Sequence, residues 1–315
     1  SLSMVSLASF LEFRNFRRIK LIYMILTSIG VVIVLTSLSE LHSVDVSTFA
    51  NLQYLRHYGG GYFSAFSLCL ALPFLFCPHF SRRLRFCIWI IVIILTLCLV
   101  LSFTRTYWIS TGVSLFFMLY LLAKAQHRHY SRLLWYMMIV AGIGMIILLG
   151  ILPYNISAFV VERVESIPNL LTDTSFQDRV EEIKGLTRTL AERPMTIPVG
   201  NGFGAKFTFY SVNPFSWGGI GWVSNDYSHN YYMYLLFATG LIGLSLFLVI
   251  WITLFLSVKK VITQLADRRA ETGKYFLIGI STAIINLLIA SLTGPPLMNF
   301  KWAIYFGILI GLALN

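Results

Sequence analysis

Arg105 is the first of three side chains whose types and settings favour chemistry at a membrane surface. It stands in "LVLSFTRTYWIS", in a connection of only two or three residues between two hydrophobic segments. An arginine this close to hydrocarbon costs about 2.5 kcal/mol or more before snorkelling, so its presence indicates a function. Because a planar guanidinium can donate two parallel hydrogen bonds to phosphate oxygens, we predict that Arg105 contacts an anionic ligand.

A second arginine lies in "SFQDRVEEIKGLTRTLAERP", residues 175–194, which is predicted to be an amphipathic helix. Its apolar stripe at helical spacing consists of Val180, Ile183, Leu186, Leu190 and Ala191. At 100° per residue, Arg179 lies within about 60° of the centre of this stripe, whereas Arg188 lies on the far side. We therefore predict that Arg179 faces the membrane and the site, and that Arg188 faces water.

The third side chain is His229, in "DYSHNYYMYLLFATGLIG", where a polar segment returns to hydrophobic sequence. An imidazole beside two arginines can accept a proton near neutral pH, so His229 is a candidate general base. Asp226 can orient the imidazole, and Asn230 can orient either the imidazole or a substrate hydroxyl. Both are also candidates for ordinary loop or helix-capping residues. Two arginines without clustered carboxylates favour an anionic ligand such as a diphosphate.

Glycines and aromatic residues fill the stretch between the second arginine and the histidine. Gly200, Gly202 and Gly204 alternate in "PVGNGFGAKF", which permits either close backbone approach to a ligand or only a tight turn. We do not read it as a nucleotide-binding motif, because no strand–turn–helix unit is predicted around it. The following "FTFYSVNPFSWGGIGWVSNDYS" is rich in aromatic residues, which can rest on lipid head groups or stack on sugar rings.

The elements that position these residues are predicted to be membrane-spanning helices. The chain has 315 residues, of which 57% are hydrophobic and only 12% charged, and its mean hydropathy is +0.76. This composition excludes a soluble domain, and several apolar runs approach the roughly 20 residues that cross a bilayer. We predict an all-α integral membrane protein with eight spans, at 19–38, 61–78, 86–103, 106–123, 133–152, 230–257, 275–293 and 300–314.

The distribution of basic residues predicts the orientation. Fifteen of the 24 lysines and arginines are assigned to one side: Arg14, Arg17, Arg18, Lys20, Arg82, Arg83, Arg85, Lys124, Arg128, Arg132, Lys259, Lys260, Arg268, Arg269 and Lys274. That side is cytoplasmic, and the net charge of +11 reflects contact with anionic lipids rather than with nucleic acid. The predicted organisation is a five-span bundle (1–152), an external loop domain (153–229) and a three-span bundle (230–315). Because the chain begins with Ser1, we also expect further sequence, with more spans, before it.

Taken together, these segments resemble the O-antigen ligase and O-antigen polymerase superfamily. The resemblance rests on the "SFTRTYW" hairpin, then "DRVEEIKGLTRTLAERPMTIPVGNGFG", then "SHNYYMYLLFATGLIG", and covers about residues 99–250. By this resemblance the family's hairpin arginine corresponds to Arg105, its loop-helix arginine to Arg179 and its histidine to His229. Family members often have a bulky aromatic residue one turn after the loop arginine, where this chain has Ile183, so Arg188 is the alternative loop arginine.

The resemblance implies a GT-C-like helical glycosyltransferase in the bacterial cytoplasmic membrane, with its long loop on the periplasmic or external side. The implied donor is a glycan on undecaprenyl diphosphate, and the implied acceptor is another glycan or lipid A-core. The implied transfer inverts the anomeric carbon and uses no metal ion or other cofactor. In that reaction Arg105 and Arg179 stabilise the diphosphate while His229 takes the proton of the acceptor hydroxyl. Arg188, Asn230, Gly200, Gly202 and Asp226 are then candidate substrate-binding residues.

Two questions of function stay open at the level of sequence. A polymerase and a ligase differ only in the acceptor, and the nearly neutral, aromatic-rich loop favours a polymerase over a ligase that must bind a phosphorylated core. A transporter of lipid-linked glycans or solutes is the alternative of a different class. It would require related halves and charged or broken segments at mid-membrane, which the sequence does not display.

Overall fold

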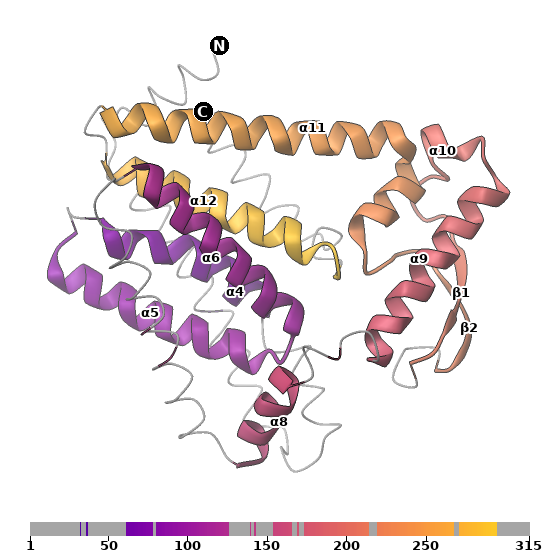
Figure 1. Ribbon diagram of the computed structural model, residues 1–315, viewed down its shortest axis with the longest axis horizontal. Coiled ribbons are helices and arrows are strands. Elements are labelled where there is room, and N and C mark those ends of the chain that lie inside the picture. The colour runs from indigo at the N-terminus through magenta and orange to yellow at the C-terminus, as the bar shows by residue number, and fades with distance from the viewer. Residues whose placement is uncertain are drawn as a thin grey trace. The chain divides into compact units, whose positions relative to one another are not determined.

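The computed structural model divides the chain into two compact units (Figure 1). It describes residues 61–77, 80–125, 154–165, 173–213, 219–267 and 271–294, with isolated positions at 32, 36, 139, 142 and 169. Unit 1 comprises Ser1–Val164, Ser257–Leu287 and Gly307–Asn315, and unit 2 comprises Glu165–Leu256 and Leu288–Phe306.

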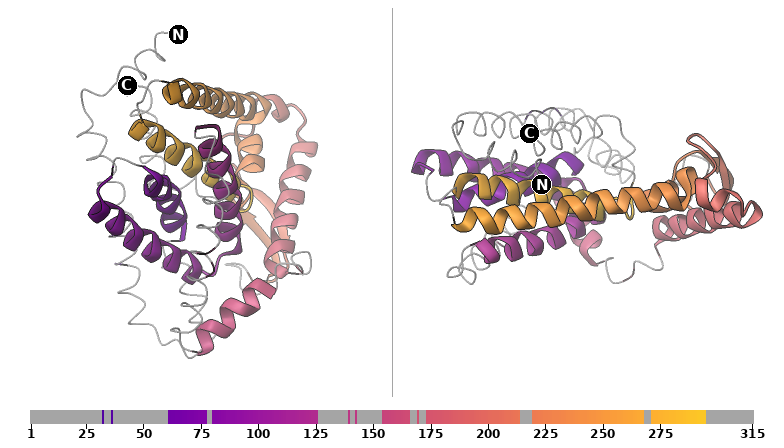
Figure 2. Two further views of the ribbon diagram at one scale, coloured as in Figure 1. Left: turned by 60° about the vertical axis from the view of Figure 1, so that its left-hand side comes forward. Right: turned by 90° about the horizontal axis from the view of Figure 1, so that it is seen from above.

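Unit 1 contains the apolar helices α4 (Gly61–Ala71) with the 3₁₀ turn η1 (Leu72–Phe76), α5 (Arg82–Leu101), α6 (Arg105–Ala125) and α12 (Glu271–Ala290). It also contains the more polar α8 (Tyr154–Glu165) and the end of α11 (Tyr231–Asp267) from Ser257 onward. Figure 2 shows α4, α5 and α6 packed side by side. Helix α12 lies against α4, where a Cβ at Gly279 would be 2.9 Å from the carbonyl oxygen of Leu70. The buried amide of Asn286 joins α12 to α6, because its Nδ2 donates to Thr111 Oγ1 at 3.1 Å and Ser110 Oγ at 3.4 Å. Such a bond stabilises helix contact where the surroundings are apolar.

Among the described residues, four helices are long and apolar enough to cross a membrane: Arg82–Leu101, Arg105–Lys124, Tyr231–Thr263 and Gly273–Ala290. They coincide with the predicted spans 86–103, 106–123, 230–257 and 275–293. The predicted span 61–78 is a shorter apolar helix, Gly61–Phe76. The predicted spans 19–38, 133–152 and 300–314 lie outside the described residues, apart from isolated positions in the first two.

Unit 2 is built on α9 (Thr174–Glu192), which packs against a two-stranded antiparallel sheet of β1 (Phe207–Ser211) and β2 (Gly221–Asn225). Figure 1 shows the hairpin alongside α9, with α10 (Thr196–Val199) beyond the helix end. The prediction of an all-α chain is therefore corrected to a mostly helical one. The strands follow from alternation in "FTFYS", where Phe207 and Phe209 point inward and Thr208 and Tyr210 point outward.

The core of unit 2 lies between α9, the hairpin and the start of α11 (Tyr231–Asp267). Its buried members are Leu186, Leu190, Phe207, Phe209 and Phe237. Gly185 brings α9 and β1 together, because a Cβ at this position would lie 2.5 Å from the carbonyl oxygen of Thr208. The inward aromatic rings therefore pack the hairpin against the helix.

Helix α11 is interrupted at Gly240, whose φ of 67° and ψ of −171° are not helical. The interruption exposes carbonyl groups at the end of the first segment. They are satisfied by Asn201, whose N–H donates to Phe237 at 2.8 Å, and by Gly202, whose N–H donates to Ala238 at 2.9 Å. A Cβ at Gly200 would overlap the backbone of Ala238, so this glycine is required by packing. The structure thus assigns Gly200 to a tight backbone junction, the simpler of the two interpretations of the glycine run.

Candidate functional site

His229 is held by a buried carboxylate that lies 47 residues earlier in the chain. Oε1 of Glu182 is 2.7 Å from Nδ1 of His229, and Oε2 accepts both the His229 backbone N–H at 2.9 Å and the Ser228 hydroxyl at 3.0 Å. The Glu182 side chain is only 2% exposed, whereas that of His229 is 36% exposed. A carboxylate acceptor keeps a proton on Nδ1, so Nε2 is left as the proton-accepting nitrogen.

A second buried carboxylate, Asp178, lies one turn before Glu182 on α9. Its Oδ1 accepts the backbone N–H of Val212 at 3.0 Å, just after β1 ends. Asp178 therefore holds the chain that leaves β1, while Glu182 holds the chain that follows β2. Two consecutive turns of one helix thus fix both ends of the hairpin and the position of the imidazole.

These contacts correct the predicted face of α9. The buried residues are Asp178, Glu182, Gly185, Leu186 and Leu190, whereas Val180 and Ile183 are half-buried and Ala191 is exposed. A carboxylate can be buried when N–H, hydroxyl or imidazole groups satisfy its oxygens, and here those groups come from distant parts of the sequence. An apolar stripe alone could not reveal them.

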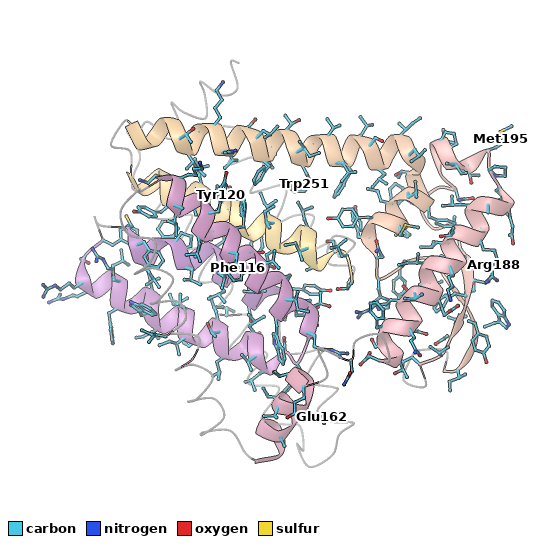
Figure 3. All side chains as sticks on the ribbon, viewed as in Figure 1. Phe116, Tyr120, Glu162, Arg188, Met195 and Trp251 are labelled. Carbon is cyan, nitrogen blue, oxygen red and sulfur yellow. The ribbon has the colours of Figure 1, made fainter. Side chains whose placement is uncertain are left out.

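Arg179 and Arg188 emerge from different parts of α9. Arg179 is half-buried and precedes Glu182 by three residues, so the two Cβ atoms are about 5–6 Å apart. It therefore starts from the turn that holds His229. Arg188 is exposed, as predicted (Figure 3). Its guanidinium lies 5.5 Å from the ring centre of Trp222 on β2.

Arg105 begins α6 in unit 1, immediately after a connection of three residues from α5. The predicted length of two or three residues is confirmed, but, contrary to the prediction, Arg105 is the first residue of α6 and does not lie within the connection. The carbonyl of Leu99 accepts the Ser102 hydroxyl at 2.6 Å and the Trp108 indole N–H at 2.8 Å, which closes the turn. Buried Phe103 adopts a φ of 48°, a conformation that only a tightly constrained turn imposes on a bulky residue.

The half-buried Arg105 therefore occupies the positive end of a helix dipole. The first turn of α6 contains no acidic residue that would offset this charge. The combination of a guanidinium and a helix N-terminus favours an anion.

Asn230 and Asp226 do not have the roles predicted for them toward the imidazole. Asn230 Oδ1 accepts the Met233 N–H at 3.0 Å, which makes Asn230 the cap of α11. The carboxylate on Nδ1 is that of Glu182, whereas Asp226 is exposed. Tyr227 lies beside His229 with ring centres 6.0 Å apart. Burial, and then the carboxylates of Glu182 and Asp226, raise the pKa of Tyr227, so its phenol stays neutral and can donate a hydrogen bond.

The fold and the site define a mostly helical membrane protein with a carboxylate–imidazole pair in the segment between two apolar helices. Residues 89–248, just over half of the 315-residue chain, match the sequence profile of the O-antigen ligase family. The chain belongs to that family, which confirms the resemblance deduced from its motifs. No curated protein is significantly similar to it in sequence. The matched region contains Arg105, Arg179, Glu182 and His229.

Proposed function

We propose that this protein transfers a glycan from undecaprenyl diphosphate to an acceptor hydroxyl at the outer face of the bacterial cytoplasmic membrane. The observation that carries the proposal is the buried Glu182 carboxylate, which orients a partly exposed His229. A histidine that served only to anchor the chain at an interface would not need a buried anionic partner. Membership of the O-antigen ligase family supports the reaction class.

In the proposed reaction His229 acts as the general base. Its Nε2 removes the proton from the acceptor hydroxyl while that oxygen forms a bond to the anomeric carbon. The bond from this carbon to the diphosphate oxygen breaks, the electron pair leaves with undecaprenyl diphosphate, and the configuration at the carbon inverts. Glu182 holds the imidazole in the reactive tautomer and stabilises the positive charge that forms on it.

Arg105 and Arg179 are proposed to bind the diphosphate and to stabilise the charge on the leaving group. For Arg105 the support is the positive helix end from which it starts, and for Arg179 it is its origin on the turn that holds His229. Guanidinium groups in these positions would replace the divalent metal that diphosphate chemistry often uses. Gly202 is exposed, and the open space beside its Cα leaves room for a substrate to approach the chain there.

The identity of the acceptor distinguishes two forms of the proposed enzyme, a polymerase and a ligase. The nearly neutral loop favours a polymerase that extends a lipid-linked repeat, whereas the description of the matched family favours a ligase that acts on lipid A-core. The glycans of a deletion strain separate them. Lipid A capped by a single repeat indicates a lost polymerase, and lipid-linked polymer beside bare core indicates a lost ligase.

The test of the reaction itself uses purified protein in nanodiscs with a lipid-linked donor, an acceptor and EDTA. We expect transfer by the wild type and a loss of transfer in His229→Ala, with membrane insertion unchanged. Glu181→Gln is the matched control, because Glu181 is a neighbour of Glu182 that pairs with Lys184 at 2.6 Å on the exposed side of α9. Full activity of His229→Ala, or movement of the lipid-linked glycan across the bilayer without transfer, would refute the proposal.

A further inference from the structure

The outer face of the hairpin carries an aromatic pair that the packing of unit 2 does not require. Tyr210 and Trp222 are register partners on β1 and β2, with ring centres 5.7 Å apart and planes at 83°. They are 42% and 65% exposed. Phe207 and Phe209 on the opposite face form the buried core with α9, and the outer pair is not part of that core.

This face is organised rather than merely apolar. The guanidinium of Arg188 lies over the Trp222 ring, which restricts the indole while most of its surface stays exposed. The neighbouring register pair on the same face, two residues along each strand, is Thr208 and Ser224, and both are exposed. The four outward positions of the two strands are therefore two aromatic rings and two hydroxyl groups, with one cation beside them.

That combination matches the chemistry of a sugar chain. A pyranose presents a face of C–H groups, which packs on an aromatic ring, and a rim of hydroxyl groups, which exchange hydrogen bonds with Thr208, Ser224 and Arg188. Insertion into the hydrocarbon of a bilayer would favour aliphatic side chains at the positions of Thr208 and Ser224, which instead carry hydroxyl groups. The hydroxyl groups beside the rings therefore favour a saccharide over insertion into the hydrocarbon.

We propose that the hairpin face formed by Thr208, Tyr210, Trp222, Ser224 and Arg188 binds the sugar chain of the lipid-linked donor. This proposal rests on the proposed function, and the donor is chosen because its glycan is common to the polymerase and the ligase reactions. The position also fits. Ser224 and Trp222 precede His229 by five and seven residues, which span at most about 18 and 25 Å, so an oligosaccharide of several sugars at His229 can reach them.

Direct binding tests the site without any need for catalysis. Oligosaccharides of one to three repeats, released by mild acid from the lipid-linked glycan of the same cells, are titrated into full-length protein in nanodiscs and followed by calorimetry. We expect Trp222→Ala to weaken binding about three- to tenfold and Trp222→Phe to retain most of it. Met195→Ala, which removes an 89% exposed side chain at the turn between α9 and α10 (Figure 3), should change nothing. Equal affinity of Trp222→Ala and wild type would overturn the proposal.

Two further experiments distinguish the donor glycan from the acceptor, and a sugar site from a membrane contact. In transfer assays Trp222→Ala should raise KM for donors of several repeats with kcat nearly unchanged, and a rise confined to the acceptor KM would overturn the donor assignment. In vesicles with brominated lipid, the absolute loss of tryptophan fluorescence should be equal in the wild type and Trp222→Phe, because a Trp222 outside the bilayer is not quenched. Stronger quenching in the wild type would place Trp222 in the bilayer and overturn the sugar site.

The failure of this inference and the failure of the proposed function are distinguishable. His229→Ala should bind the oligosaccharides like the wild type while it transfers nothing. If the wild type transfers nothing but Trp222→Ala still loses binding, the sugar site stands and the proposed reaction fails. If transfer occurs and Trp222→Ala alters neither binding nor KM, the reaction stands and the sugar site fails.

Discussion

The replacement of Glu182 by glutamine is the sharpest test of the carboxylate–imidazole pair. The carboxylate accepts three hydrogen bonds, two at Oε2 and one at Oε1. A glutamine has only one oxygen, so its NH₂ group must occupy one of these two positions. At the Oε2 position it would meet the His229 backbone N–H, a donor that cannot reverse its role.

The amide therefore turns its NH₂ group toward Nδ1. Nδ1 must then accept a hydrogen bond, which moves the ring proton to Nε2 and removes the nitrogen that accepts the substrate proton. The same tautomer error in hydrolases with a carboxylate–imidazole pair lowers kcat by about 10⁴. We expect a loss of about 10³ or more in kcat for Glu182→Gln, with KM little changed because the shape of the site is retained.

The assay is transfer from lipid-linked donor by the purified variant, with thermal unfolding measured in parallel. Glu181→Gln serves as the control, since it removes the same charge one residue away on the exposed side. A kcat for Glu182→Gln within threefold of the wild type, in protein that unfolds at the same temperature, would refute the assignment of His229 as an oriented base.

Three further outcomes are expected. Gly200→Ala should lower the free energy of unfolding by about 2–4 kcal/mol, because its φ of 82° is strained for alanine and its Cβ overlaps the backbone of α11. Gly202 has a similar φ of 88°, but a Cβ there would meet only open space, so Gly202→Ala should lower the free energy of unfolding by only about 1 kcal/mol. Both values are measured by chemical unfolding, and equal losses for the two variants would contradict the packing argument. Arg105→Lys and Arg179→Lys should each reduce kcat/KM about 10- to 100-fold, because lysine cannot form the paired hydrogen bonds, and a change below twofold would remove that arginine from the diphosphate site. Because its folded pKa is raised, Tyr227 resists ionisation in the native state, so stability should fall as pH rises above the unfolded value of about 10. Tyr227→Phe should lessen that fall in thermal unfolding between pH 8 and 11, and an unchanged pH dependence would contradict the buried setting of the phenol.

The membrane class, four of the spans and the short turn before Arg105 are properties that the sequence determined by itself. Hydrophobic runs and tight turns depend on residues that are neighbours in the chain, so a pattern of about 20 residues contains the necessary information. The family motifs are likewise visible in the sequence segments around Arg105, Arg179 and His229. The hairpin was missed, although its strands alternate inward and outward residues, because an aromatic-rich stretch near a membrane has several competing interpretations.

Only the tertiary structure decided which carboxylate meets the imidazole. Glu182 and His229 are 47 residues apart, and the intervening chain forms a hairpin whose two ends are held by Asp178 and Glu182 on successive turns of α9. Asp178 and Glu182 are buried on a face that the apolar stripe did not predict. The free energy of burying a carboxylate depends on its hydrogen-bond partners, and these come from distant parts of the chain that no local pattern contains. Close approach at Gly200 and the capping role of Asn230 were likewise decided by which backbone groups lie opposite them. Residue types and local spacing therefore identified the histidine, and long-range hydrogen bonding determined how it is oriented.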